Sequence, residues 1–271
     1  MRVAGVIRGG LAAALLLLAA CTDLSAVRDF SRLAAGTAEY GGIVQRYATY
    51  DVRMQRYRPG FPALAERRQQ AEGLRALQTA VTDYMTALGA LAEDAGVAPA
   101  AATPLAEAAT RAGLLEPSLT PTVSALGGIV LRAATEGWRQ RRLGTMIGEA
   151  NAPLQSVIAA LVRFVEATGQ EDRDERNAAM TYYGLLERRS PNQPAGVAAL
   201  KEWRELRLAE IDSRAALRRT YLEAMRKIAA GHQLLYDSRG DLSLAETQRQ
   251  IRAVNRELQM IGRTLQRLVL S

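Results

Sequence analysis

Catalytic and metal chemistry depends on a few residue types, and two of them are almost missing from this 271-residue chain. The sequence contains one histidine, His232, and one cysteine, Cys21. They are too few for an ordinary zinc site, and no Glu-x-x-His pair exists for a di-iron bundle. Gly-x-Ser-x-Gly, Ser-x-x-Lys and glycine-rich phosphate loops are also absent. We therefore expect no metal, no cofactor and no catalytic residues, and we favour a protein that is not an enzyme.

The remaining candidates for acid–base chemistry are one acidic cluster and the histidine. The cluster consists of Glu171, Asp172, Asp174 and Glu175. Arg173 and Arg176 are interleaved with it, and Asp172 forms an i,i+4 pair with Arg176. This pattern favours a solvated helical face over a catalytic pair of carboxylates. His232 falls on an apolar helical stripe, so we favour a packed, hydrogen-bonded histidine over a general base or a pH sensor.

Aromatic residues offer a third kind of candidate site. Four tyrosines share the first predicted helix: Tyr40, Tyr47, Tyr50 and Tyr57. They could line a groove for a sugar or an aromatic ligand, although burial inside a helical bundle explains them as well. Trp138 and Trp203 carry no motif, and a packed core accounts for them in the same way.

The first twenty residues have the layout of a secretory leader. Arg2 and Arg8 form a short positive region, and an uncharged apolar run extends from Leu11 to Ala20. Ten residues are too few to cross a bilayer core, for which a helix needs about 20. We therefore expect residues 1–20 to be a signal peptide that is removed.

The sequence Leu18-Ala19-Ala20-Cys21 resembles the lipobox of bacterial lipoproteins, and the resemblance covers residues 1 to about 22. It implies attachment of a diacylglycerol to the Cys21 thiol, cleavage before Cys21 and usually acylation of the new amine, with palmitate among the expected chains. Two or three acyl chains anchor a protein stably. Thr22 stands where an aspartate would resemble an inner-membrane retention signal, although Asp23 follows. We expect a location at the outer membrane, facing the periplasm.

Charge and composition limit the possible partners. Without Arg2 and Arg8, the chain's 35 basic residues become 33 against 28 acidic residues, a net charge of +5. Only Lys201 and Lys227 are lysines, and arginine binds carboxylates and phosphates with a forked geometry. Codon bias in a GC-rich genome explains the arginines equally well. Nucleic acid is not expected outside the cytoplasm, whereas an envelope protein or an anionic envelope polymer is.

The elements that must position these residues are all predicted helices, because apolar residues recur at spacings of three and four. The expected N-terminal helices cover about 24–57, 62–94, 104–113, 121–150 and 151–186. Asn151 is expected to cap the last of these, with Pro153 just inside it. The first two helices are expected to pair in antiparallel fashion. We expect the second half of the 151–186 helix to project from the bundle.

The last two helices are predicted over about 197–237 and 244–270, with a capping box formed by Ser243 and Glu246. The spacing of seven predicts a coiled-coil seam of Leu244, Ile251, Leu258 and Leu265. We therefore predict an elongated antiparallel all-α bundle with a long projecting C-terminal hairpin, through which an oligomer could form. The expected division is a signal peptide at 1–20, an N-terminal bundle at 21–168, and a long helix with the hairpin at 169–271.

The hairpin is the expected interaction surface, because a narrow seam leaves its other faces free. The expected partner-binding residues are Trp203, Arg204, Arg207, Arg214 and Arg218. Aromatic residues and arginine dominate many interfaces. Trp203, Leu206 and Leu217 are expected to lie away from the seam, and the alternative is that these apolar residues pack on 180–186. We interpret the protein as a lipid-anchored, non-catalytic scaffold, adaptor or binding protein of the cell envelope. A periplasmic ligand carrier or hydrolase, with its site between helices of the N-terminal bundle, is the alternative.

Overall fold

The computed structural model describes residues 23–270, and every regular element in this range is helical. The all-α prediction is therefore confirmed. The α-helices are α2 (Ser25–Ala38), α3 (Gly42–Ala48), α4 (Tyr50–Gln55), α5 (Ala65–Ala92), α6 (Thr103–Ala112), α7 (Leu119–Thr135), α8 (Leu143–Ala167), α9 (Gly169–Arg189), α10 (Pro194–Asp237) and α11 (Ala245–Leu270), with short 3-10 turns η1 (Pro99–Ala102) and η2 (Gln140–Arg142). The expected signal peptide and Cys21 lie outside the described residues.

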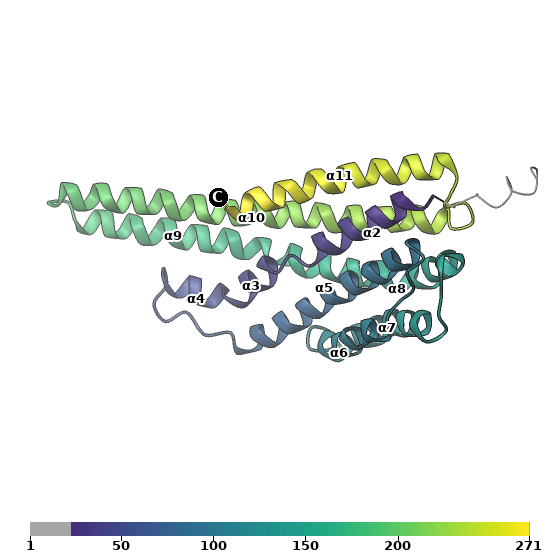
Figure 1. Cartoon of the computed structure of the whole chain (residues 1–271). Helices are drawn as coiled ribbons and strands as arrows, with labels where there is room; N and C mark the ends of the chain where they lie inside the picture. The colour runs from purple at the N-terminus through teal and green to yellow at the C-terminus, as the bar shows by residue number, and fades with distance from the viewer. Residues whose placement is uncertain (1–22, 271) are drawn as a thin grey trace, which may run out of the picture.

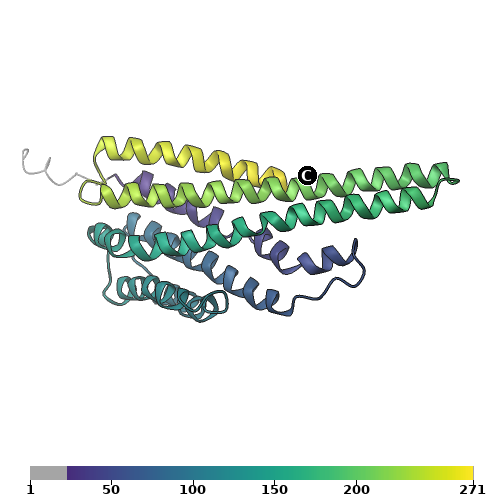
Figure 2. The same ribbon diagram turned by 180° about the vertical axis from the view of Figure 1, so that it is seen from behind.

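The molecule is elongated, and α10 runs along its whole length (Figures 1 and 2). With 44 residues, α10 is about 66 Å long at 1.5 Å per residue. The start of α2 and the α10–α11 turn lie at one end, which we call the proximal end. The α9–α10 turn lies at the opposite, distal end. One helix thus connects the two ends of the molecule.

Two apolar clusters hold the helices together. The larger core is built from α2, α5, α6, α7, α8, the second half of α10 and α11, and its residues include Phe30, Leu77, Leu126, Leu154, Met225 and Leu258. The smaller core joins α4, α9 and the first half of α10 through Tyr50, Met54, Tyr57, Ala178, Ala179, Tyr183 and Ile211. The larger core draws residues from both sides of position 168, so the two parts predicted to meet there share one packed unit.

The prediction of one helix over 24–57 is wrong, because the chain bends twice and forms α2, α3 and α4 instead. The first break includes Gly41 and the start of α3 at Gly42, and each glycine weakens a helix by up to about 1 kcal/mol relative to alanine. The second break falls at Thr49, which has non-helical backbone angles. These bends bring α4 against α9 and so create the smaller core.

The predicted helix boundary at Asn151 is also wrong. The break comes earlier, where Gly137 adopts a left-handed conformation and the Trp138 amide donates to the carbonyl of Ala133. This is the Schellman arrangement that ends many helices. Asn151 and Pro153 therefore lie inside α8. The prediction treated Asn151, a common capping residue, and Pro153 as signs of a helix start, whereas Gly137 marks the actual break between the helices.

The C-terminal pair α10 and α11 does not project as predicted. Its seam is present, since Ile251, Leu258 and Leu265 are buried, but α11 also packs on α2 and joins the larger core. Leu244 precedes the helix and is exposed. The segment that extends beyond the bundle is the hairpin of α9 and the first half of α10 (Figure 1). The α9 arm of this hairpin corresponds to the second half of the predicted 151–186 helix, which was expected to project. None of the described helices combines the length and apolarity needed to cross a membrane.

Candidate partner-binding surface

His232 is a fully buried part of the larger bundle. Its Nε2 lies 2.7 Å from the Tyr84 hydroxyl and its Nδ1 lies 2.9 Å from Oδ1 of Asn151. Because an amide oxygen only accepts, Nδ1 carries the proton and Tyr84 donates to Nε2. Burial lowers the pKa of His232 from 6.5 to about 3. The interpretation of a packed, hydrogen-bonded histidine is confirmed.

The acidic cluster is not the solvated face that its sequence pattern indicated. Glu175 is 2% exposed and lies between two arginines: one carboxylate oxygen is 2.8 Å from Arg53 Nε and the other is 2.5 Å from Arg214. Arg214 also pairs with Glu210, and Arg53 donates to the carbonyl of Arg46. This layer ties the α3–α4 segment to α9 and α10. A periodic pattern within one helix could not reveal partners more than 35 residues away.

Two further carboxylates of the acidic cluster also pair with arginines of the chain. Asp172 accepts a 3.0 Å bond from Arg218, and Glu171 lies 2.5 Å from Arg67. The Arg67 guanidinium lies over the rings of Tyr47 and Tyr50, at 4.1 and 4.9 Å from their centroids. These tyrosines therefore stack on an internal arginine, a cation–π contact, rather than opening a ligand groove.

The predicted partner-binding arginines are largely engaged within the chain. Arg214 is buried against Glu175, so the expectation that it is free to bind a partner is wrong. Arg218 is mostly covered and pairs with Asp172. Arg204 pairs with Glu187 across the hairpin, and Arg207 pairs with Glu210 one turn further along α10. Leu217, also expected outside the seam, is fully buried in the larger core.

Trp203, by contrast, is 57% exposed, and its neighbour Leu206, three residues on, is 61% exposed. Leu185 of α9 is exposed as well, and it follows Tyr182 by one turn; the ring of Tyr182 contacts that of Tyr57, two residues after the end of α4. Trp203 lies on the same stripe of α10 as Arg207 and Glu210, at spacings of four and seven. Leu185, Trp203 and Leu206 are thus large exposed apolar residues of the hairpin formed by α9 and the first half of α10. We call these three residues the distal patch.

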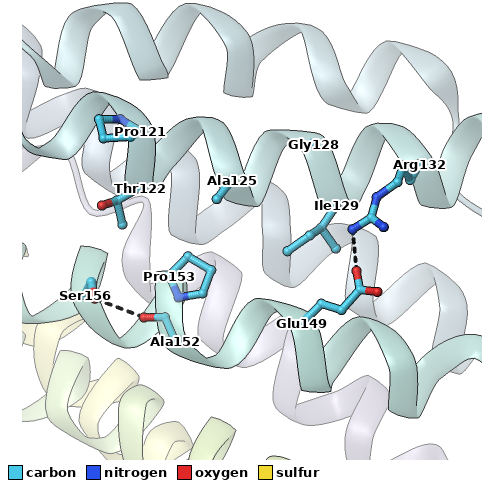
Figure 3. Close-up of a pocket in the computed structure, with 10 residues that line it drawn as sticks. All are labelled: Pro121, Thr122, Ala125, Gly128, Ile129, Arg132, Glu149, Ala152, Pro153 and Ser156. Atoms are coloured by element: carbon cyan, nitrogen blue, oxygen red, sulfur yellow. Dashed lines mark hydrogen bonds and ion pairs between the residues drawn. The ribbon is translucent and has the colours of Figure 1, made fainter.

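A shallow groove of about 710 Å³ runs between α7 and α8. Figure 3 shows Arg132 and Glu149 paired at one end and Pro121, Thr122 and Ser156 at the other. Pro153 has no amide hydrogen, so the helical bond to the carbonyl of Glu149 cannot form beside the groove. The walls are mainly apolar and small, and they bring together no acid–base pair other than this ion pair.

A second groove, of about 780 Å³, lies between α2 and α11. Its walls include Leu33 from α2, Tyr40 just after α2 and Leu258 from α11. Gly36 and Gly262 also line it, and a Cβ at either position would meet no atom within 4 Å. Arginine is the charged residue type among its described lining residues, so it lacks the paired carboxylate that a hydrolase would need.

Residues 23–270 contain no group of three or more His, Cys, Asp or Glu side chains placed to hold a metal ion. The chain matches no protein-family model, no curated protein and no solved structure. Sequence reasoning missed Asn151, which is partly buried and contacts His232, and the buried Glu175, which two arginines share.

Proposed function

We propose that this protein is a lipid-anchored, non-catalytic scaffold or adaptor of the bacterial cell envelope, which holds the distal patch away from the membrane for a protein partner. The observation that carries the proposal is the position of Trp203. Trp203 is exposed and belongs to the first quarter of α10, and this helix begins at the distal end, opposite to the start of α2 (Figure 1). Asp23, the first described residue, follows the expected lipid attachment point at Cys21 by two positions.

The chemistry of the distal patch supports a protein partner. A large exposed tryptophan, with two exposed leucines on the same hairpin, supplies the aromatic anchor on which many binding hot spots are built. The flanking charges of Arg204 and Arg207 are compensated by intramolecular carboxylates. Apolar contact, rather than net positive charge, would therefore dominate the affinity.

Rigidity supports the same proposal. The hairpin is fixed at its base by the Arg53–Glu175–Arg214 layer and by the aromatic contacts of Tyr57 with Tyr182 and Tyr183. A pre-ordered surface loses less conformational entropy when a partner binds. The patch would thus be presented in one geometry at a set distance from the anchor.

Two experiments test the two halves of this proposal. Metabolic labelling with a palmitate analogue should mark the wild type and fail for Cys21→Ala. Labelling that persists in this variant contradicts the anchor.

For the patch, Trp203→Ala with Leu206→Ser should reduce partner recovery after in-cell crosslinking at least about tenfold, since hot-spot truncations cost 2 kcal/mol or more each. The matched control is Leu114→Ser with Leu131→Ser, which removes two exposed leucines elsewhere. Equal recovery from both double variants contradicts a role for the patch.

The ligand carrier or hydrolase remains the less supported alternative. Its expected site needed tyrosines and paired carboxylates around a cavity between the N-terminal helices. Tyr47 and Tyr50 instead stack on Arg67, and Tyr57 belongs to the smaller core. Tyr40 does border the α2–α11 groove, where no described carboxylate joins it.

A further inference from the structure

The proximal end carries a cluster of exposed arginines that no described carboxylate neutralises through an ion pair. Arg139, Arg141 and Arg142 surround a small surface pocket of about 230 Å³, next to the buried ring of Trp138. Arg141 and Arg142 are exposed and make no ion pair with a described residue. Arg239, in the α10–α11 turn, is also exposed. We call these four residues the proximal arginine cluster.

Side-chain contacts connect this cluster to α2. Arg139 donates to the carbonyl of Asp94 at 3.0 Å, and the adjacent Glu93 pairs with Arg32 in α2. On the other side, the backbone of Arg239 packs so closely on α8 that a Cβ at Gly144 would lie 2.7 Å from its carbonyl oxygen. Figures 1 and 2 show the α10–α11 turn and the start of α2 at the same end.

The nearby carboxylates leave the cluster with excess positive charge. Glu136, the one acidic residue lining the pocket, accepts a 2.7 Å bond from the indole of Trp138. Asp94 accepts from the backbone amide of Gln140. Asp237 accepts from Gln233, and Asp241 is the other carboxylate of the turn region. None of these four groups forms an ion pair with an arginine of the cluster.

We propose that the proximal arginine cluster docks on the phosphate headgroups of an anionic lipid surface. The inference rests on the proposed function, because that function places the lipid anchor at this same end. Two residues of extended chain span at most about 7 Å, so an acylated Cys21 would enter the bilayer close to the start of α2. Guanidinium groups bind phosphate through forked hydrogen bonds, and attraction to anionic lipids falls off within about 10 Å.

An apolar residue accompanies the charges. Leu244, at the end of the α10–α11 turn, is 54% exposed, and it is well placed to enter the headgroup region beside Arg239. Lipid chains, arginines and this leucine would contact the bilayer together. The long axis would then stand away from the membrane, with the distal patch at the far end.

The test uses the acyl-free chain produced from Thr22. Every buried core residue of the described range lies between Leu24 and Leu265, so this chain keeps the whole fold. Its binding to vesicles containing phosphatidylglycerol is compared with binding to pure phosphatidylcholine. Arg141→Gln with Arg142→Gln should weaken binding to the anionic vesicles about tenfold or more, because each arginine near such a surface contributes a several-fold gain.

The matched control is Arg188→Gln with Arg189→Gln, an adjacent arginine pair at the distal end with the same charge change. It should bind like the wild type. Equal losses from both double variants, or no loss from the proximal one, overturn the proposal. If inorganic phosphate at matched ionic strength competes for the protein as well as the anionic vesicles do, the pocket binds free phosphate, and this result also overturns the proposal. Since the assay contains no acyl chain, its outcome is independent of the palmitate labelling that tests the anchor.

Discussion

At the scale of single residues, the polar groups inside this protein are paired with few exceptions. His232 is sealed between Tyr84 and Asn151, and Asn151 donates in turn to Gln233. Such pairing is required because a buried polar group without a partner costs about 1–3 kcal/mol. The histidine was recognised as a packed residue from its position on an apolar stripe. Its two partners were not predictable, because they come from helices 81 and 148 residues away.

The first prediction concerns the pH dependence of stability. The folded pKa of His232 is lowered to about 3, whereas an unfolded histidine titrates at 6.5. As the pH falls below about 6.5, His232 becomes protonated in the unfolded chain but stays neutral in the folded protein. The free energy of unfolding therefore decreases. The loss should reach about 2 kcal/mol between about pH 7 and pH 5, as measured by urea unfolding.

The control for this prediction is His232→Gln, measured over the same pH range. Asp83 has a pKa raised to about 6 by burial and by Glu39, so its contribution has the opposite sign: stability rises as the pH falls through 6. Asp83 is present in both proteins and cancels in their difference. A wild type that loses no more stability than this variant contradicts the buried, neutral histidine.

The second prediction concerns Glu175. Glu175→Gln removes the charge shared by Arg53 and Arg214, which leaves the mostly buried Arg53 without a carboxylate partner and Arg214 with Glu210 alone. The free energy of unfolding should fall by about 3–5 kcal/mol. Glu166→Gln, which breaks an exposed pair with Arg226, should change it by less than about 1 kcal/mol. Comparable losses in denaturant titrations would show that burial does not distinguish the two pairs.

At the scale of helices, the periodic patterns correctly predicted which segments are helical but placed several helix ends wrongly. The helices α5, α6, α10 and α11 begin and end within three residues of their predicted limits. The errors lie where the chain bends, at Gly41, Thr49 and Gly137, and at Thr168, where the predicted 151–186 helix divides into α8 and α9. A pattern with a period near 3.6 continues across such bends, so it cannot report them. The bends at Gly41 and Thr49 bring α4 against α9. The early break at Gly137 places Asn151 inside α8, where it contacts His232.

A third prediction compares two glycines on neighbouring helices. In Gly231→Ala, the new Cβ would lie 2.4 Å from the ring of Phe30, so the variant should lose about 1–3 kcal/mol despite alanine's better helix propensity. In Gly262→Ala the Cβ meets nothing within 4 Å, and the gain should be up to about 1 kcal/mol. Thermal unfolding of both variants checks the opposite signs. Stabilisation of both would contradict the close contact of α10 with α2.

At the scale of the whole molecule, the central feature is the separation of two different ends. The proximal end gathers the start of α2 and the proximal arginine cluster, and the distal end carries Trp203 and its neighbours. The sequence indicated Trp203 as a binding residue, together with arginines that in fact form ion pairs within the chain. Those pairs could not be predicted, because ion-pair partners depend on the tertiary fold. The length of α10, about 66 Å, sets the distance between the ends.

The most direct test of the account is site-specific photocrosslinking in living cells, with the full-length protein in its own envelope. A photoreactive amino acid is placed at Leu206 in the distal patch, and separately at Leu131 on the exposed side of α7. The account predicts a discrete protein adduct from position 206, lost on adding Trp203→Ala, and none from position 131. Adducts from position 131 with none from position 206 would contradict it, and would move the binding surface to the α7–α8 side of the bundle.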